Sequence, residues 1–204
     1  MRVLATALLA TVLALPQGVS ADEITDQIDQ ARHYYDQGDI PGAVSELEFA
    51  LQALRGKIGE QLLATFPEPP AGWRIEDPGD QSRGANPLMG AGTMLSRTYR
   101  SGEGDGEASI EAQLMAGSGF LQGLAGMLMN PQVLAAQPNA KRVRIGRDNA
   151  VVTYDAEDKS AQLVIDLGGK GTIMLQGHNV KSGDPLVALA NKWDLRKVKE
   201  LLGS

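Results

Sequence analysis

The feature that most limits the fold of this chain is the stretch 141–178, in which apolar and polar residues alternate. Val143 and Ile145 fall on one side of this pattern, and Arg142 and Arg144 fall on the other. Turn-forming residues divide the stretch into four runs, at 142–146, 151–154, 162–167 and 172–176. Since a period of two is typical of a sheet with one buried face, we predict an antiparallel meander.

The amino end has the order of a secretory signal peptide. Arg2 precedes an apolar run at 3–15, and the small residues Val19-Ser20-Ala21 place the expected cleavage after Ala21. The apolar run is short for a membrane span, so an uncleaved anchor is only the alternative. We therefore expect a mature chain of 183 residues (204 − 21) in a bacterial periplasm, with no stable membrane span after signal cleavage. The chain contains no cysteine, so its core alone must stabilise the fold.

Charge is distributed unevenly along the chain. Without Arg2 the mature chain carries 18 basic and 25 acidic residues, a net of −7. The segment 22–66 contains nine acidic and three basic residues and so accounts for −6 of this total. Such asymmetry predicts two modules, and it argues against a nucleic-acid partner, which needs a concentrated basic face.

Two helices are predicted within the acidic segment 22–66. Ile24, Ile28, Ala31 and Tyr35 recur at helical spacing, and Gly38-Asp39 ends this first helix. A second apolar stripe then follows, formed by Ile40, Ala43, Val44, Leu47, Ala50, Leu51, Leu54, Ile58 and Leu62. Because the turn is short, we expect an antiparallel hairpin with the two apolar stripes facing each other.

The residues around this turn resemble one tetratricopeptide repeat. The match runs over 34–51, from Tyr34-Tyr35 through Gly38-Asp39-Ile40 to the pairs Ala43-Val44 and Ala50-Leu51. The proline that usually follows the second helix is absent near Leu54, and no second copy follows. The resemblance implies protein–protein contact, with Tyr34 and Tyr35 as candidate partner-binding residues. The alternative is a two-helix extension that only caps the sheet.

A Pro-rich segment, 67–72, is expected to link the hairpin to a domain at 73–204. In that domain we expect strands at 73–75, 93–100 and 108–116 before the meander, and helices that begin at Asp184-Pro185 and at Asp194. The predicted class is α+β, with an N-terminal antiparallel helical hairpin and an antiparallel sheet of about six or seven strands covered by helices.

The order of these elements, entered through Pro69-Pro70-Ala71-Gly72-Trp73, is similar to that of PsbP-like domains. This resemblance implies an α/β/α sandwich that serves as a non-catalytic binding and assembly module. No functional residue of this chain is inferred from this resemblance.

An almost uncharged segment, 120–136, has apolar residues at helical spacing among several glycines. We expect either a core helix buried between layers or an exposed apolar surface. In the second case its candidate contacts with an apolar ligand or lipid are Phe120, Leu121, Leu124, Met127 and Leu128.

We predict no catalytic residue, metal site or cofactor site. Only two histidines occur, and we expect His33 to pair with Asp29 on a helix surface and His178 to be a solvated strand end. Gly169-Lys170-Gly171-Thr172 lacks the spacing of a phosphate loop and is expected to be a hairpin turn. The methionines are expected to fill the core rather than to bind copper(I).

The strongest charged feature is the basic group Lys141, Arg142, Arg144 and Arg147, with Arg97 and Arg100 expected as neighbours across the sheet. It is either a solvated edge strand protected from aggregation or a receptor for an anionic surface, such as the acidic hairpin. Arg142, Arg144 and Arg147 are therefore candidate partner-binding residues.

The function we expect is that of a non-enzymatic periplasmic binding or adaptor protein. It would contact an envelope or periplasmic protein, in the assembly or support of an envelope complex. The alternative is a periplasmic carrier of an apolar ligand or lipid, lined by residues 120–129.

Overall fold

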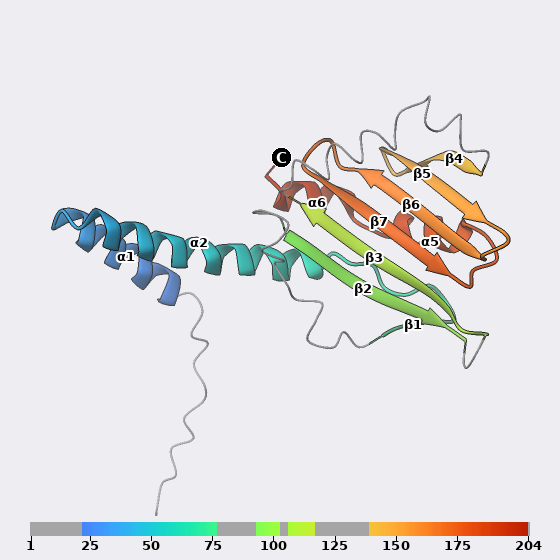
Figure 1. The fold of residues 1–204 in the computed structure, drawn as a ribbon, viewed down its shortest axis with the longest axis horizontal. Coiled ribbons are helices and arrows are strands. Elements are labelled where there is room, and N and C mark those ends of the chain that lie inside the picture. Colours follow the sequence, from blue (N-terminus) through green and yellow to red (C-terminus); the bar gives the residue numbers. More distant parts are fainter. Residues whose placement is uncertain (1–21, 77–92, 103–105, 117–138, 204) are drawn as a thin grey trace, which may run out of the picture. The chain divides into compact units, whose positions relative to one another are not determined.

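The computed structural model describes residues 22–76, 93–102, 106–116 and 139–203 (Figure 1). Contacts divide the chain into two compact units, Met1–Gly56 and Lys57–Ser204. In the described ranges, none of the helices combines the length and the apolar character that a bilayer crossing requires. The predicted apolar segment 120–136 lies outside the described residues.

The first unit contains α1 (Asp22–Asp36) and most of α2 (Ile40–Leu63), which lie side by side. Gly38 has a φ of +81°, a conformation that favours glycine, and this lets the chain reverse between the helices. The Asp39 backbone N–H donates to the Tyr34 carbonyl at 2.9 Å. Its carboxylate accepts the Gly42 N–H at 3.0 Å, which caps the new helix. The predicted helical hairpin is confirmed.

The second unit is built on one antiparallel sheet, for which the described residues supply seven strands. The strands are β1 (Trp73–Ile75), β2 (Thr93–Ser101), β3 (Ala108–Ala116), β4 (Ala140–Ile145), β5 (Asp148–Asp155), β6 (Ser160–Asp166) and β7 (Gly171–His178). Their order in the sheet is β1-β2-β3-β7-β6-β5-β4, so the meander β4 to β7 docks its last strand on β3. The predicted α+β class and the predicted meander are both confirmed.

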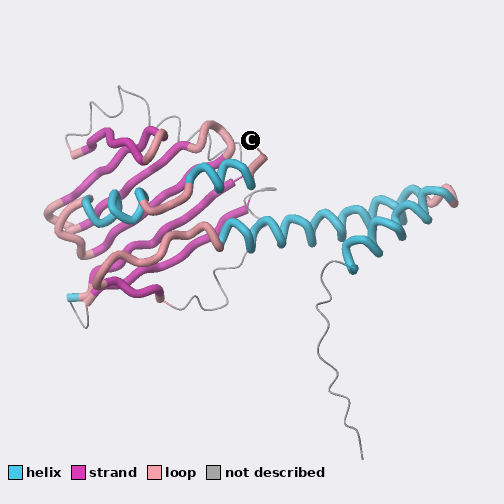
Figure 2. Tube along the Cα trace, turned by 180° about the vertical axis from the view of Figure 1, so that it is seen from behind, coloured by secondary structure: helices cyan, strands magenta, loops and turns pink. Residues whose placement is uncertain are grey.

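Two helices, α5 (Asp184–Asn191) and α6 (Leu195–Leu201), cover one face of the sheet (Figure 2). Ile110, Leu163 and Leu175 point to this side from the central strands and are fully buried together with Leu186 and Leu189 of α5. Burial of apolar surface on this side forms the core of the second unit. The predicted covering helices are confirmed.

The opposite face of the sheet is less polar than the alternation predicts. Val164 shares this face with Gln162 and Asp166, yet it is only 4 % exposed. Val151, its direct neighbour on β5, is 6 % exposed. The centre of the sheet is therefore buried on both sides, which a period of two does not reveal.

The two predicted helix starts at the carboxyl end differ in outcome. Asp194 caps α6 as expected, because its side chain accepts the Lys197 N–H at 3.0 Å. Asp184 does not cap α5: the cap position is Gly183, without a side-chain cap. Asp184 is held instead by Ser182, whose hydroxyl donates to its carboxylate at 3.0 Å. The carboxylate that was expected to cap the helix N-terminus is thus hydrogen-bonded to a serine two residues earlier.

Gly171, in the turn that superficially suggested phosphate binding, is explained by packing. A Cβ at this position would lie 2.6 Å from the Met115 carbonyl oxygen on β3. Gly171→Ala is therefore expected to lower the free energy of unfolding by about 1–3 kcal/mol, as measured by urea denaturation. Gly106→Ala is the matched control, because a Cβ there meets no atom within 4 Å. Equal stability of the two variants would contradict this account of β3–β7 packing.

Candidate functional site

Small residues occupy most of the buried positions of the hairpin. Ala31 of α1 is 4 % exposed, and Ala43 and Ala50 of α2 are 5 % and 2 % exposed. Tyr34 lies over the start of α2, since a Cβ on Gly42 would be 3.1 Å from its ring. Because these buried alanine side chains are small, burial in the hairpin uses little of the apolar surface that α2 carries.

The large apolar residues of α2 are left in solvent. Six of them are between 41 % and 51 % exposed: Ile40, Val44, Leu47, Leu51, Leu54 and Ile58. They succeed one another at intervals of four, three, four, three and four residues. This is the spacing of a coiled-coil seam, and we call these six side chains the α2 seam. The expectation that the whole apolar stripe of α2 faces α1 is therefore wrong, because these six large side chains are exposed.

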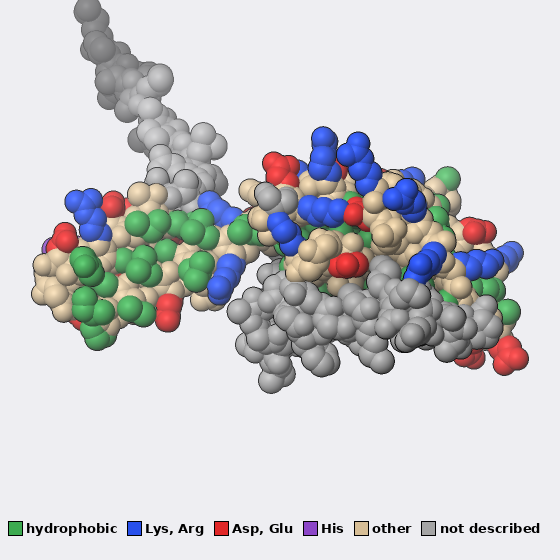
Figure 3. Space-filling view, turned by 90° about the horizontal axis from the view of Figure 1, so that it is seen from above, with side chains coloured by type: hydrophobic (Ala, Val, Ile, Leu, Met, Phe, Trp, Pro, Cys, Tyr) green, Lys and Arg blue, Asp and Glu red, His purple; other side chains and the backbone are tan. Residues whose placement is uncertain are grey.

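Two large residues of α1 extend the α2 seam into a wider face. Ile28 is 45 % and Tyr35 is 66 % exposed, and each directly follows a half-buried residue, Gln27 and Tyr34. In α2, Val44 and Leu51 likewise directly follow buried alanines. One residue is a rotation of about 100° on a helix. In an antiparallel pair this equal offset places both stripes on the same side, and Figure 3 shows apolar surface (green) along the hairpin.

The two tyrosines chosen from the sequence separate in the structure. Tyr34 is half-buried beside the first turn of α2, whereas Tyr35 is exposed on the apolar face. The sequence signal for the α2 seam was the heptad spacing of the large residues, together with alanines one position earlier. The tetratricopeptide resemblance indicated Tyr34 and Tyr35 instead.

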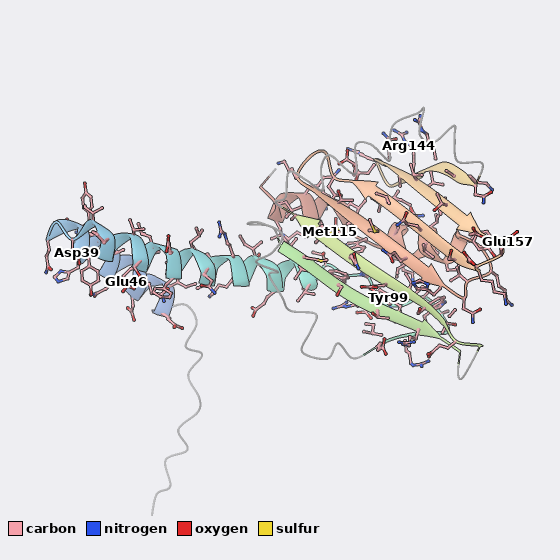
Figure 4. All side chains as sticks on the ribbon, in the orientation of Figure 1. Asp39, Glu46, Tyr99, Met115, Arg144 and Glu157 are labelled. Atoms are coloured by element: carbon pink, nitrogen blue, oxygen red, sulfur yellow. The ribbon has the colours of Figure 1, made fainter. Side chains whose placement is uncertain are left out.

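The basic candidates lie at the β4 edge of the sheet: Arg142 and Arg144 are on β4, and Arg147 is in the turn that follows it. Figure 4 shows Arg144 at this edge. All three are exposed. Arg142 and Arg144 stand on the same face of β4, as their register with Val151 and Asn149 requires. Edge charges of this kind also prevent strand addition by another chain, so position alone does not make them a binding site.

The expectation that Arg97 and Arg100 neighbour these arginines is wrong. They are on β2, five strand positions from β4, which is about 24 Å at ~4.8 Å per strand. Arg100 is held by Glu76 at 2.8 Å and by Glu107 at 3.0 Å. Arg97 points to the other face and donates to the Phe66 and Leu63 carbonyls, both at 3.3 Å.

The apolar contact candidates at 120–128 lie outside the described residues. These are Phe120, Leu121, Leu124, Met127 and Leu128. On the second face of the sheet the structure describes a buried Met115, which is 6 % exposed (Figure 4).

The remaining polar candidates do not converge into a reactive centre. His33 pairs with Gln37, at 2.8 Å between Nε2 atoms, and no bond to the expected Asp29 is present in the described hairpin. His178 is exposed at the end of β7. Among the described residues, no three His, Asp or Glu side chains are placed to share a metal ion.

Comparison of this chain with protein-family models, with curated proteins and with solved structures gives no match. The α2 seam is therefore the surface on which a functional argument can be built.

Proposed function

We propose that this protein is a non-enzymatic binding module that acts through protein–protein contacts, and that the α2 seam is the surface it uses. The observation that carries the proposal is the exposure of six large apolar side chains, each between 41 % and 51 %, on one stripe of one helix. Exposed apolar side chains that follow one another along one stripe mark an interaction site. Scattered single residues would carry no such meaning.

The hairpin also lacks the covering that its resemblance to a tetratricopeptide repeat would require. In such arrays a neighbouring repeat buries the second face of each hairpin, and here no further repeat follows in the sequence. An isolated hairpin with an exposed heptad stripe therefore supports a partner that supplies the missing helical surface. The signal peptide that the sequence predicts at 1–21 supports a partner in the periplasm or envelope within the same proposal.

The test is site-specific photocrosslinking in cells. A photoreactive residue at Leu47 or Leu51 lies on the α2 seam, and one at Ser45 or Gln52 is equally exposed but on another side of the helix. We expect protein adducts from the two seam positions and none from the two control positions. Equal labelling at all four positions, or none at any, would argue against the proposed function.

A further inference from the structure

We infer that the partner of the α2 seam is a second copy of this chain, whose α2 lies antiparallel on the first. The inference rests on the proposed function, because it names the occupant of the same surface. A strict seam of alternating three- and four-residue steps fits one other helix with the same spacing. The α2 of a second copy has this spacing because its sequence is the same, and two copies would pair through a two-fold interface.

The spacing of the seam matches itself when the partner runs in the opposite direction. Aligned about residue 49, Val44 of one copy meets Leu54 of the partner and Leu47 meets Leu51, and each layer occurs twice by symmetry. Every layer then combines side chains that are more than two-fifths exposed in the single chain. No polar residue falls within these layers.

Acidic side chains beside the seam come together in this pair. Glu48 and Arg55 are both exposed and flank the seam on the side away from the buried alanines. With the two copies aligned about residue 49, the Glu48 of one copy is two positions along the axis from the Glu48 of the other and five positions from its Arg55. The two glutamates repel each other, and the arginines offset part of that repulsion.

The exposed residues of α1 point to the same arrangement. Ile28 and Tyr35 lie on the same side of the hairpin as the α2 seam. When two hairpins meet face to face with α2 on α2, α1 meets α1, and these residues are covered as well. If α2 met α1 instead, a seam of six apolar side chains would face only two. The product of the matched arrangement is a four-helix bundle.

The net charge of the hairpin predicts a different salt dependence for self-pairing than for binding to a basic surface. Residues 22–56 carry eight acidic and two basic residues, a net of −6 in each copy. Two such hairpins repel at long range, and salt screens this repulsion. Self-association should therefore tighten as ionic strength rises. The opposite is expected if the acidic hairpin is bound by Arg142, Arg144 and Arg147 of another copy, because salt weakens attraction between opposite charges.

The first experiment is sedimentation velocity of the purified chain over a range of concentrations and salt. We expect a dimer whose dissociation constant rises at least about 100-fold in Leu47→Glu/Leu51→Glu. Ser45→Glu/Gln52→Glu adds the same charge on another side of the helix and should leave the dimer intact. Both pairs of sites are exposed, and unchanged circular dichroism confirms that each variant is folded.

The second experiment uses the absence of cysteine from the native chain. Val44→Cys alone should not form a disulfide under mild oxidation, because two antiparallel copies hold these positions ten residues, about 15 Å, apart along the axis. A mixture of Val44→Cys and Leu54→Cys should form a mixed disulfide. Gln52→Cys is the exposed control and should remain reduced.

The outcomes are distinct. A disulfide from Val44→Cys alone would show parallel pairing and overturn the inference, and so would a dimer that survives Leu47→Glu/Leu51→Glu. A monomer at every concentration, with seam adducts to a different protein in cells, would overturn self-pairing but leave the proposed function. A monomer without seam adducts would contradict both the self-pairing and the proposed function.

Discussion

Trp193→Ala is expected to lower the free energy of unfolding by about 3–5 kcal/mol. Trp193 follows α5 and is only 4 % exposed. Its ring lies 4.4 Å from that of Phe66, between centroids, and is tilted by 46°. Its Nε1–H donates to the Thr65 hydroxyl at 3.1 Å, and that hydroxyl donates to the Leu62 carbonyl at 2.7 Å. The substitution removes this packing and leaves a cavity at the end of α2.

The measurement is urea unfolding followed by far-ultraviolet circular dichroism, since removal of a tryptophan alters fluorescence directly. Trp193→Phe keeps an aromatic ring against Phe66 and loses the N–H donor, so a smaller cost of about 1 kcal/mol is expected. Trp73→Ala, at a half-buried site on the edge strand β1, is the control for loss of an indole. A cost below about 1 kcal/mol for Trp193→Ala would mean that this aromatic contact is not part of the stable core.

The sheet was predictable because alternation and turn chemistry are local. Leu163 and Ile165 are buried where the pattern puts them, and strands β1 and β3 have the predicted limits. Val164 was not predictable in the same way, because its burial depends on what covers the second face. A side-chain period assigns a residue to a face, but it does not say whether that face meets water.

The order of the strands could not be predicted from the order in the sequence. β7 pairs with β3, so the first three strands and the meander meet in the middle of the sheet. This pairing puts β2 and β4 far apart and separates Arg97 from Arg142. Which strands become neighbours is decided by long-range packing, which leaves no local pattern in any of them.

The candidate site shows the same limit on α2. Periodicity groups Ala43, Val44, Leu47 and Ala50 into one apolar stripe of α2. It does not decide which half of the stripe contacts α1. In the structure Ala43 and Ala50 are buried in the hairpin, whereas the six large residues of the seam are exposed. Side-chain size within the stripe is the signal that identifies the seam.

Tyr99 is expected to make the stability of the second unit fall steeply above pH 10. It is fully buried on β2, and its hydroxyl donates to the Pro67 carbonyl at 2.7 Å (Figure 4). Burial raises the pKa of Tyr99 from 10.0 to about 12, partly opposed by the charge of Arg97. The unfolded chain therefore loses this proton first as pH rises. The stabilisation is complete below pH 10 and is lost between pH 10 and about 12, by on the order of 2–3 kcal/mol.

Tyr99→Phe should remove that alkaline loss, at a constant cost. Phenylalanine has no proton to lose, but the Pro67 carbonyl is left without its donor, so the variant should be about 1–3 kcal/mol less stable at pH 8. Urea denaturation at several pH values should then show the gap between the variant and the original chain closing as pH approaches 12. Tyr154→Phe is the control, because that hydroxyl makes only a 3.4 Å bond to Val180 from a half-buried site. A gap for Tyr99→Phe that stays constant with pH would show that the phenol is not held neutral by burial, and would place its hydroxyl in contact with water.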